Sequence, residues 1–481
     1  MNPTENKTSC ESEINDSLRV PLLALFGGAA LWLVGGLLLG LIAGIKFHAP
    51  DFLGGCPLFT YGRVAPAAND LLLYGFCIPA ALGVMLWIFA RLSQSPLALP
   101  LVPVVAAHLW HLGVFIGTAG ILLGGSTGHL WLEYPRAAAV LLFAAFLLIA
   151  VSAAATFGWR QEKSLYPSHW FLFAALLWFP WIYSTANLFL NAHQLPRGVV
   201  QPIICWWFAS NLIFVWLGLV GVGIAFYFLP KFSGRPLASS GYALLGFLSL
   251  VFFGTWCGIP PGAPVPAWLP ALSGVAALLT IIPLLAILIV AVKTVCGASV
   301  SCNGGPFCFI KIGMISFIVA GGLYIAAACP QYSRVLEFTW FGAAQVQLQL
   351  LGFTAMILFG AIYFLLPQVM GRPLPLAKFT KLHFFLSVAG ALLLVVPLVA
   401  AGIVQGEKLA DASVAFADAN SAALKFLRIS TLGQLALLAG SLLFAANIFA
   451  MTIQWKLGIA RTVIDYIKSP LATAKTSEVK S

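Results

Sequence analysis

Twelve apolar stretches, each close to 20 residues or longer, run along this chain of 481 residues and restrict it to one class of fold. About 20 apolar residues are needed for an α-helix to cross the hydrocarbon core of a membrane. The expected spans are residues 20–45, 68–91, 99–124, 137–159, 168–191, 202–229, 238–258, 267–292, 311–329, 344–368, 382–405 and 430–454. Soluble domains carry roughly 25% charged residues, whereas this chain carries 8%. The sequence therefore predicts an all-α membrane protein of about twelve transmembrane helices.

Charged residues gather outside the apolar stretches and predict the domain organisation. Residues 1–19 form a polar tail, residues 20–455 a single transmembrane domain, and residues 456–481 a basic tail. If the N-terminus is cytoplasmic, 17 of the 25 Lys and Arg fall in cytoplasmic segments, which is the bias that such segments show. We therefore expect both termini in the cytoplasm. The net charge of +11 then reflects topology, and we expect contact with membrane lipid and no nucleic acid partner.

A series of short polar and aromatic strings accompanies the spans. In chain order the strings are Tyr61-Gly62-Arg63, Leu73-Tyr74-Gly75-Phe76, Glu133-Tyr134-Pro135, Ser168-His169-Trp170-Phe171, Trp206-Trp207-Phe208-Ala209-Ser210-Asn211, Phe226-Tyr227-Phe228-Leu229-Pro230-Lys231, Gly360-Ala361-Ile362-Tyr363-Phe364, Leu382-His383-Phe384 and Gly402-Ile403-Val404-Gln405-Gly406. In order and spacing, the series resembles subunit I of the haem–copper oxidases. Its closest branch is the cbb3-type cytochrome c oxidases, with the nitric oxide reductase large subunit as a relative.

The resemblance implies a bundle that holds a low-spin haem, a high-spin haem and a copper ion, and that reduces dioxygen to water. Such a site needs six His ligands, because imidazole suits both haem iron and copper. At the family's ligand positions this chain has Ala68, Ser210, Pro260, Pro261, Gln345 and Gln347, and at the position of the redox-active Tyr it has Gly254. The chain has seven His, and none lies between His193 and His383. We therefore expect no metal ligands and no catalytic residues at these positions.

Two groups of polar residues within the spans are further candidates. His108 and His111 are three residues apart and share a helix face. They could bind a metal or a haem, although hydrogen bonding to neighbouring helices is the favoured interpretation. Gln345, Gln347 and Gln349 could form a polar chamber where the family holds its haems, or they could make hydrogen bonds between helices.

Glu133 and Arg136 lie at the outer end of the fourth expected span, near Trp131 and Tyr134. The resemblance implies that this region faces a c-type cytochrome subunit, which makes Glu133 and Arg136 candidate partner contacts. The alternative is an aromatic belt at the membrane interface with its accompanying charges.

Three hypotheses for the function follow. The first is a noncatalytic member of the oxidase subunit I family, which serves as a structural or assembly platform in a respiratory electron-transport complex of the bacterial inner membrane. It would bind a c-type cytochrome or other oxidase subunits. The second is an active terminal oxidase or nitric oxide reductase subunit with unusual metal ligation. The third is a transporter or proton channel, which would need acids within the membrane; Asp70 is the candidate in the first half of the chain.

Overall fold

The fold is an all-helical bundle, seen in a computed structural model that describes residues 3–191, 198–298 and 302–478. In chain order the elements are α1 Pro3–Ile45, η1 Pro57–Phe59, α2 Tyr61–Asp70, η2 Leu71–Cys77, α3 Ile78–Ser93, α4 Leu101–Leu122, α5 Arg136–Gly158, α6 Pro167–Asn191, α7 Val200–Ser210, η3 Asn211–Trp216, α8 Leu217–Ser233, α9 Ser240–Gly254, α10 Trp268–Leu279, α11 Ile281–Val295, α12 Pro306–Ala328, α13 Pro330–Leu336, α14 Trp340–Gln347, η4 Leu348–Ala355, α15 Met356–Met370, α16 Ala377–Leu409 and α17 Phe416–Glu478. Within these ranges, eleven helices are long and apolar enough to cross a membrane. The shorter apolar helix α9 matches the remaining expected span, 238–258. The predicted class is confirmed.

Three spans occupy the centre of the bundle. They are Tyr61–Ser93, Val200–Ser233 and Trp340–Met370. In the most apolar 18 residues of each, the buried share is 100%, 94% and 89%, respectively, whereas the same share is 33% to 50% in the other long spans. Each central span contains a π-helical segment, namely η2, η3 or η4. π-Helical turns are rare and frequently accompany functional sites. The bundle therefore places its three irregular helices together at its centre.

The π-helical segments lie beside three residues that were expected from the sequence at ligand positions. η2 begins three residues after Ala68, η3 directly after Ser210 and η4 directly after Gln347. Within η4 the hydroxyl of Thr354 donates to the carbonyl oxygen of Gln349, five residues earlier, at 2.9 Å. This side-chain bond has the same spacing as the backbone i→i+5 hydrogen bonds of a π-helix. Backbone irregularity thus lies next to three of the expected ligand positions.

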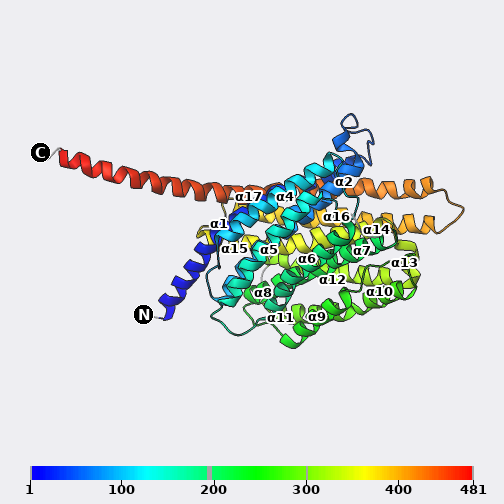
Figure 1. The fold of residues 1–481 in the computed structure, drawn as a ribbon, viewed down its shortest axis with the longest axis horizontal. Coiled ribbons are helices and arrows are strands. Elements are labelled where there is room, and N and C mark those ends of the chain that lie inside the picture. Colours follow the sequence, from blue (N-terminus) through cyan, green and yellow to red (C-terminus); the bar gives the residue numbers. More distant parts are fainter. Residues whose placement is uncertain (1–2, 192–197, 299–301, 479–481) are drawn as a thin grey trace.

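Both termini lie at the same end of the bundle (Figure 1). Helix α1 starts at Pro3, so the described part of the polar N-terminal segment continues directly into the first span. Helix α17 continues beyond the other helices to Glu478 (Figure 1). Both expected tails are therefore helical in their described parts.

Aromatic side chains fill much of the interior. One group centres on Phe179, whose ring stacks on Phe146 at 4.3 Å between centroids and also contacts Tyr183 and Trp216. These rings come from α5, α6 and η3, so they tie three spans together. Buried aromatic pairs contribute about 0.5–1.5 kcal/mol each beyond the burial of their area.

Candidate functional site

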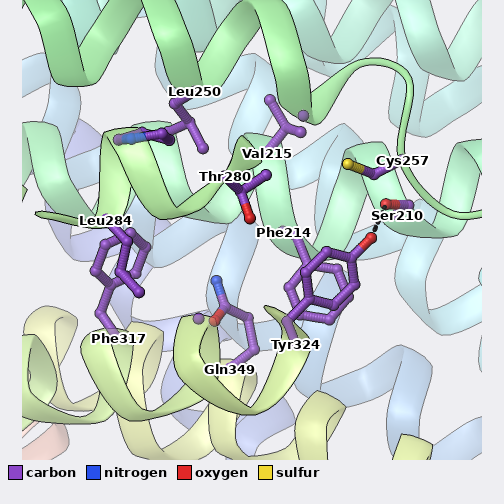
Figure 2. A pocket seen from close by; sticks show the side chains of 13 residues that line it. Ser210, Phe214, Val215, Leu250, Cys257, Thr280, Leu284, Phe317, Tyr324 and Gln349 are labelled. Atoms are coloured by element: carbon purple, nitrogen blue, oxygen red, sulfur yellow. Dashed lines mark hydrogen bonds between the residues drawn. The ribbon is translucent and has the colours of Figure 1, made fainter. Parts of the chain in front are cut away.

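A small cavity of about 50 Å³ lies between the central helices and the segment α9–α12 (Figure 2). Ser210 at the end of α7 and Gly254 at the end of α9 both line it. The structure thus brings together Ser210 and Gly254, the residues expected from the sequence at the positions of a copper ligand and of the redox-active Tyr. The other polar groups in its lining are Cys257, Thr280, Tyr324 and Gln349.

Tyr324 extends from α12 into this cavity, and its hydroxyl lies 3.5 Å from Oγ of Ser210 (Figure 2). The aromatic ring packs on Phe214, with 4.4 Å between centroids. A phenol therefore reaches the cavity from a helix other than the one that carries Gly254. No pattern in the sequence pointed to Tyr324, because α12 contributes to the cavity only through its packing.

The loop after α9 closes the cavity at Ser210. Gly258 has φ +107°, and a Cβ placed on it would lie 2.5 Å from Cβ of Ser210. Only glycine combines this backbone conformation with so close an approach. The loop thereby brings Cys257 to the cavity, whereas Pro260 and Pro261 are absent from its lining. Pro260 is buried in the loop and Pro261 is exposed.

A second cavity, of about 110 Å³, lies among α1, α2, η2, α14, η4, α16 and α17. Ala68 and Gln347 both line it, and they come from two of the three central spans. Nε2 of Gln347 donates to Oδ1 of Asn69 at 3.1 Å. Oε1 of Gln347 and Oε1 of Gln434, from α17, are buried and accept no hydrogen bond from the described residues. Ala68 and Gln347, two more residues expected from the sequence at ligand positions, therefore meet here.

The three glutamines do not line one chamber. Gln347 lines the cavity with Ala68, Gln349 lines the cavity with Ser210, and Gln345 lines neither. Gln345 is buried, and its Nε2 has no partner among the described residues. Successive helical residues are turned by about 100°, so alternate glutamines face different neighbours. The expectation of a shared polar chamber is corrected to two separate cavities.

The donor atoms at these cavities do not fit haem or copper. Imidazole, thiolate and thioether groups hold haem iron and copper, and a Tyr phenolate can also hold haem iron. Neither cavity offers an imidazole: the first has one thiol and one phenol, from Cys257 and Tyr324, the second has one phenol, from Tyr61, and their other polar groups are hydroxyls and amides. Across the described residues, no three His, Cys, Asp or Glu side chains gather as a metal site would require. Each cavity has space for no more than a few water molecules. A tetrapyrrole would need rearrangement of the surrounding side chains.

His108 and His111 contact different surroundings. His108 is exposed on α4, and its Nδ1 bonds to the carbonyl oxygen of Val104 at 2.7 Å. Nδ1 of His111 accepts from the indole of Trp32, and its Nε2 bonds to the carbonyl oxygen of Ala24, each at 3.2 Å. The contacts of His111 join α4 to α1, as the favoured interpretation expects, whereas the bond of His108 stays within α4.

Glu133 and Arg136 face in different directions. Glu133 is 8% exposed and lies beside Asp70 of α2. Burial raises the pKa of the Glu133 carboxyl to about 7. Arg136 is exposed at the start of α5. The proximity of Asp70 to Glu133 was not expected from the sequence, because 63 residues separate them.

Comparisons with known proteins agree with this architecture. The family described as cytochrome c and quinol oxidase polypeptide I matches residues 20–436. The cytochrome c oxidase subunit 1 homolog of Azorhizobium caulinodans is 24% identical over 446 residues, covering 88% of this chain and 80% of that protein. The cbb3-type cytochrome c oxidase subunit CcoN1 of Stutzerimonas stutzeri is 23% identical over 386 residues, covering 78% and 81%.

A solved structure has the same fold. It is a haem–copper terminal oxidase dimer studied by electron cryo-microscopy, which matches with a TM-score of 0.66 and 15% identity over 92% of this chain and 84% of that chain. The match covers nearly all of this chain. Together with the family match over residues 20–436, this means that the chain belongs to the subunit I family of the haem–copper oxidases.

Proposed function

We propose that this chain is a noncatalytic, subunit I-like protein of a respiratory electron-transport complex and that it acts as a structural or assembly platform. The observation that carries the proposal is the pairing of substituted positions at the bundle centre. Ala68 lines one cavity with Gln347, and Ser210 lines the other with Gly254. The frame is that of an oxidase core, whereas the side chains at its centre are poor ligands for haem iron and copper.

The proposed location is the bacterial inner membrane, with both termini cytoplasmic. The position of both termini at one end of the bundle (Figure 1) and the excess of Lys and Arg on that side support this orientation. In this proposal residues 20–455 form the single transmembrane domain, and residues 1–19 and 456–481 are the flanking cytoplasmic segments.

The proposed partners are a membrane-anchored c-type cytochrome or other oxidase subunits. The names of the relatives support this part of the proposal, since they are themselves oxidase subunits. Arg136 is the better candidate for a direct contact because it is exposed, whereas Glu133 is buried within the chain.

An absorption spectrum combined with iron and copper analysis tests the proposed loss of catalysis. The purified chain should show no b-type haem bands and far less than one iron or copper per chain. A cbb3-type subunit I purified in the same detergent is the control, and it should show both haem and copper. A stoichiometric low-spin haem spectrum from this chain alone would favour an active oxidase with unusual ligation and overturn the proposal.

Affinity purification tests the platform role. Tagged protein extracted from its native membrane should bring down a c-type cytochrome or an oxidase subunit, both identified by mass spectrometry. Arg136→Ala should reduce that recovery, whereas Lys163→Ala, in the exposed loop after the same helix, should leave it unchanged. Recovery of the tagged chain without any oxidase subunit would contradict the platform role.

A further inference from the structure

Asp70 and Glu133 bring two carboxyl groups together in the interior of the protein. Asp70 is the last residue of α2 and is 1% exposed. It belongs to the span Tyr61–Ser93, whose most apolar 18 residues are entirely buried. Glu133 belongs to the loop between α4 and α5 and is 8% exposed. The two carboxyl groups lie close enough to interact directly.

Neither carboxyl finds a basic partner. The ion pairs among the described residues join Arg19 to Asp16 and Arg91 to Glu11, in other parts of the molecule. Both Oδ atoms of Asp70 and Oε2 of Glu133 are buried without a donor from the described residues. A buried carboxylate that lacks a donor or a counter-charge is costly, and such a group takes up a proton instead.

The phenols around the pair are engaged elsewhere. The hydroxyl of Tyr74 donates to the carbonyl oxygen of Trp131 at 2.6 Å, and the hydroxyl of Tyr134 is bonded to Thr118 at 3.3 Å. The titratable groups that face the pair are Tyr74 from η2, Tyr134 from the loop, Tyr183 from α6 and Cys205 from α7. All four are neutral acids that carry no positive charge. The two carboxyl groups are therefore left as hydrogen-bond partners for each other.

We propose that Asp70 and Glu133 form a proton-binding site, in which a single proton is shared between the two carboxyl groups and joins α2 to the loop before α5. Asp70 holds the proton and donates it to Glu133. This assignment follows from the surroundings: the backbone N–H groups of Trp131 and Glu133 lie near the Glu133 carboxylate, whereas no donor among the described residues reaches Asp70. Two adjacent carboxyls that share one proton act as a unit.

This shared proton holds the loop against the central span. The same loop is anchored by the bond from Tyr74 to Trp131 and by a hydrogen bond from Thr127 Oγ1 to the carbonyl oxygen of Leu132 at 2.7 Å. Loss of the proton would place two negative charges side by side beneath the loop. The loop would then separate from Asp70, because like charges at this depth repel strongly.

Infrared spectroscopy on the full-length protein in detergent tests the site. A protonated carboxyl has a C=O stretching band separate from the carboxylate bands, and the band shifts in ²H₂O. At neutral pH we expect this band in the unsubstituted protein and its loss in Asp70→Asn, because the amide N–H then supplies the donor to an ionised Glu133. Specific ¹³C labelling of aspartate carboxyls should shift the band in the unsubstituted protein, which requires no variant to fold.

Controls separate this site from other acids and from a bound cation. Glu162→Gln, at a fully exposed carboxylate held by Ser164, should leave the band unchanged. Glu337→Gln removes another loop carboxyl, which is exposed, and should leave the Asp70 contribution intact. The proposal is overturned if ¹³C-aspartate does not shift the band, if Asp70→Asn retains it, or if added calcium removes it, since a cation would then occupy the pair.

Discussion

Nε2 of Gln347 donates a hydrogen bond to Oδ1 of Asn69 at 3.1 Å, and this bond links two of the three central spans beside Ala68. The contact lies beside Ala68 and includes Gln347, two residues expected from the sequence at haem-ligand positions. A side-chain hydrogen bond thus connects two of the central spans.

A double-mutant cycle should measure this bond. Asn69→Leu and Gln347→Leu each remove one partner, and their coupling in unfolding free energy should be about 0.6 kcal/mol and no more than about 2 kcal/mol. Asn69→Leu combined with Gln349→Leu is the matched control, because Gln349 lines the other cavity. The control pair should be additive. Equal coupling in both cycles would show that the 3.1 Å contact is not the source.

The buried pair Tyr363 and His383 should contribute more. The hydroxyl of Tyr363 is hydrogen bonded to Nδ1 of His383 at 3.0 Å, and both side chains are almost fully buried. Tyr363→Phe leaves the imidazole without this partner and should cost about 1–3 kcal/mol. Tyr332→Phe, at a side chain 55% exposed, should be neutral. Thermal unfolding in detergent measures both, and an unchanged midpoint for Tyr363→Phe would refute the prediction.

Stability should fall as pH rises from about 4.5 to about 7. Burial raises the pKa of Glu133 from 4.5 to about 7, so within that window the folded protein binds more protons than the unfolded chain. The free energy of unfolding therefore decreases with pH, by about 3 kcal/mol at most. Denaturation at a series of pH values should show the decline, and Glu133→Gln should flatten it. A decline of the same size in Glu133→Gln would assign it to other groups.

Close packing of α16 on α17 should make Gly433 intolerant of a side chain. A Cβ at this position would lie 2.5 Å from the backbone nitrogen of Leu394 and 2.7 Å from the carbonyl oxygen of Gly390. Gly433→Ala should cost about 1–3 kcal/mol, as overpacking does. Gly322→Ala on α12 has open space around it and should be neutral or stabilising by up to about 1 kcal/mol. Parallel thermal unfolding of the two variants provides the comparison; equal midpoints would contradict the predicted clash.

Hydropathy predicted the helices because lipid imposes a simple rule on sequence. Every backbone polar group must be satisfied within its own span, so apolar length alone located the twelve helices. At the central spans, the observed helix boundaries differ from the expected ones. The second was expected at 68–91, whereas the helix runs continuously over Tyr61–Ser93, because it extends beyond the apolar stretch into exposed residues such as Tyr61 and Gly62.

The candidate site was predicted only in part. The ordered strings located Ala68, Ser210, Gly254 and Gln347, and the structure groups these four into two cavities. Tyr324 was missed, since a single Tyr in an apolar span gives no signal of which helix it faces. The π-helical segments were missed as well, because one extra residue in a helical turn leaves hydropathy unchanged.

The sequence by itself determined that the chain lies in a membrane and how many apolar segments it has. It also determined which side chains stand at the expected ligand positions. These properties depend on residue type and chain order alone. Tertiary structure decided which residues meet. Asp70 and Glu133 come from separate elements, and nothing in either local sequence requires the other. Their proximity arises from the packing of the loop over η2, and burial, which only the folded chain supplies, makes two ordinary carboxyls into a site for a shared proton.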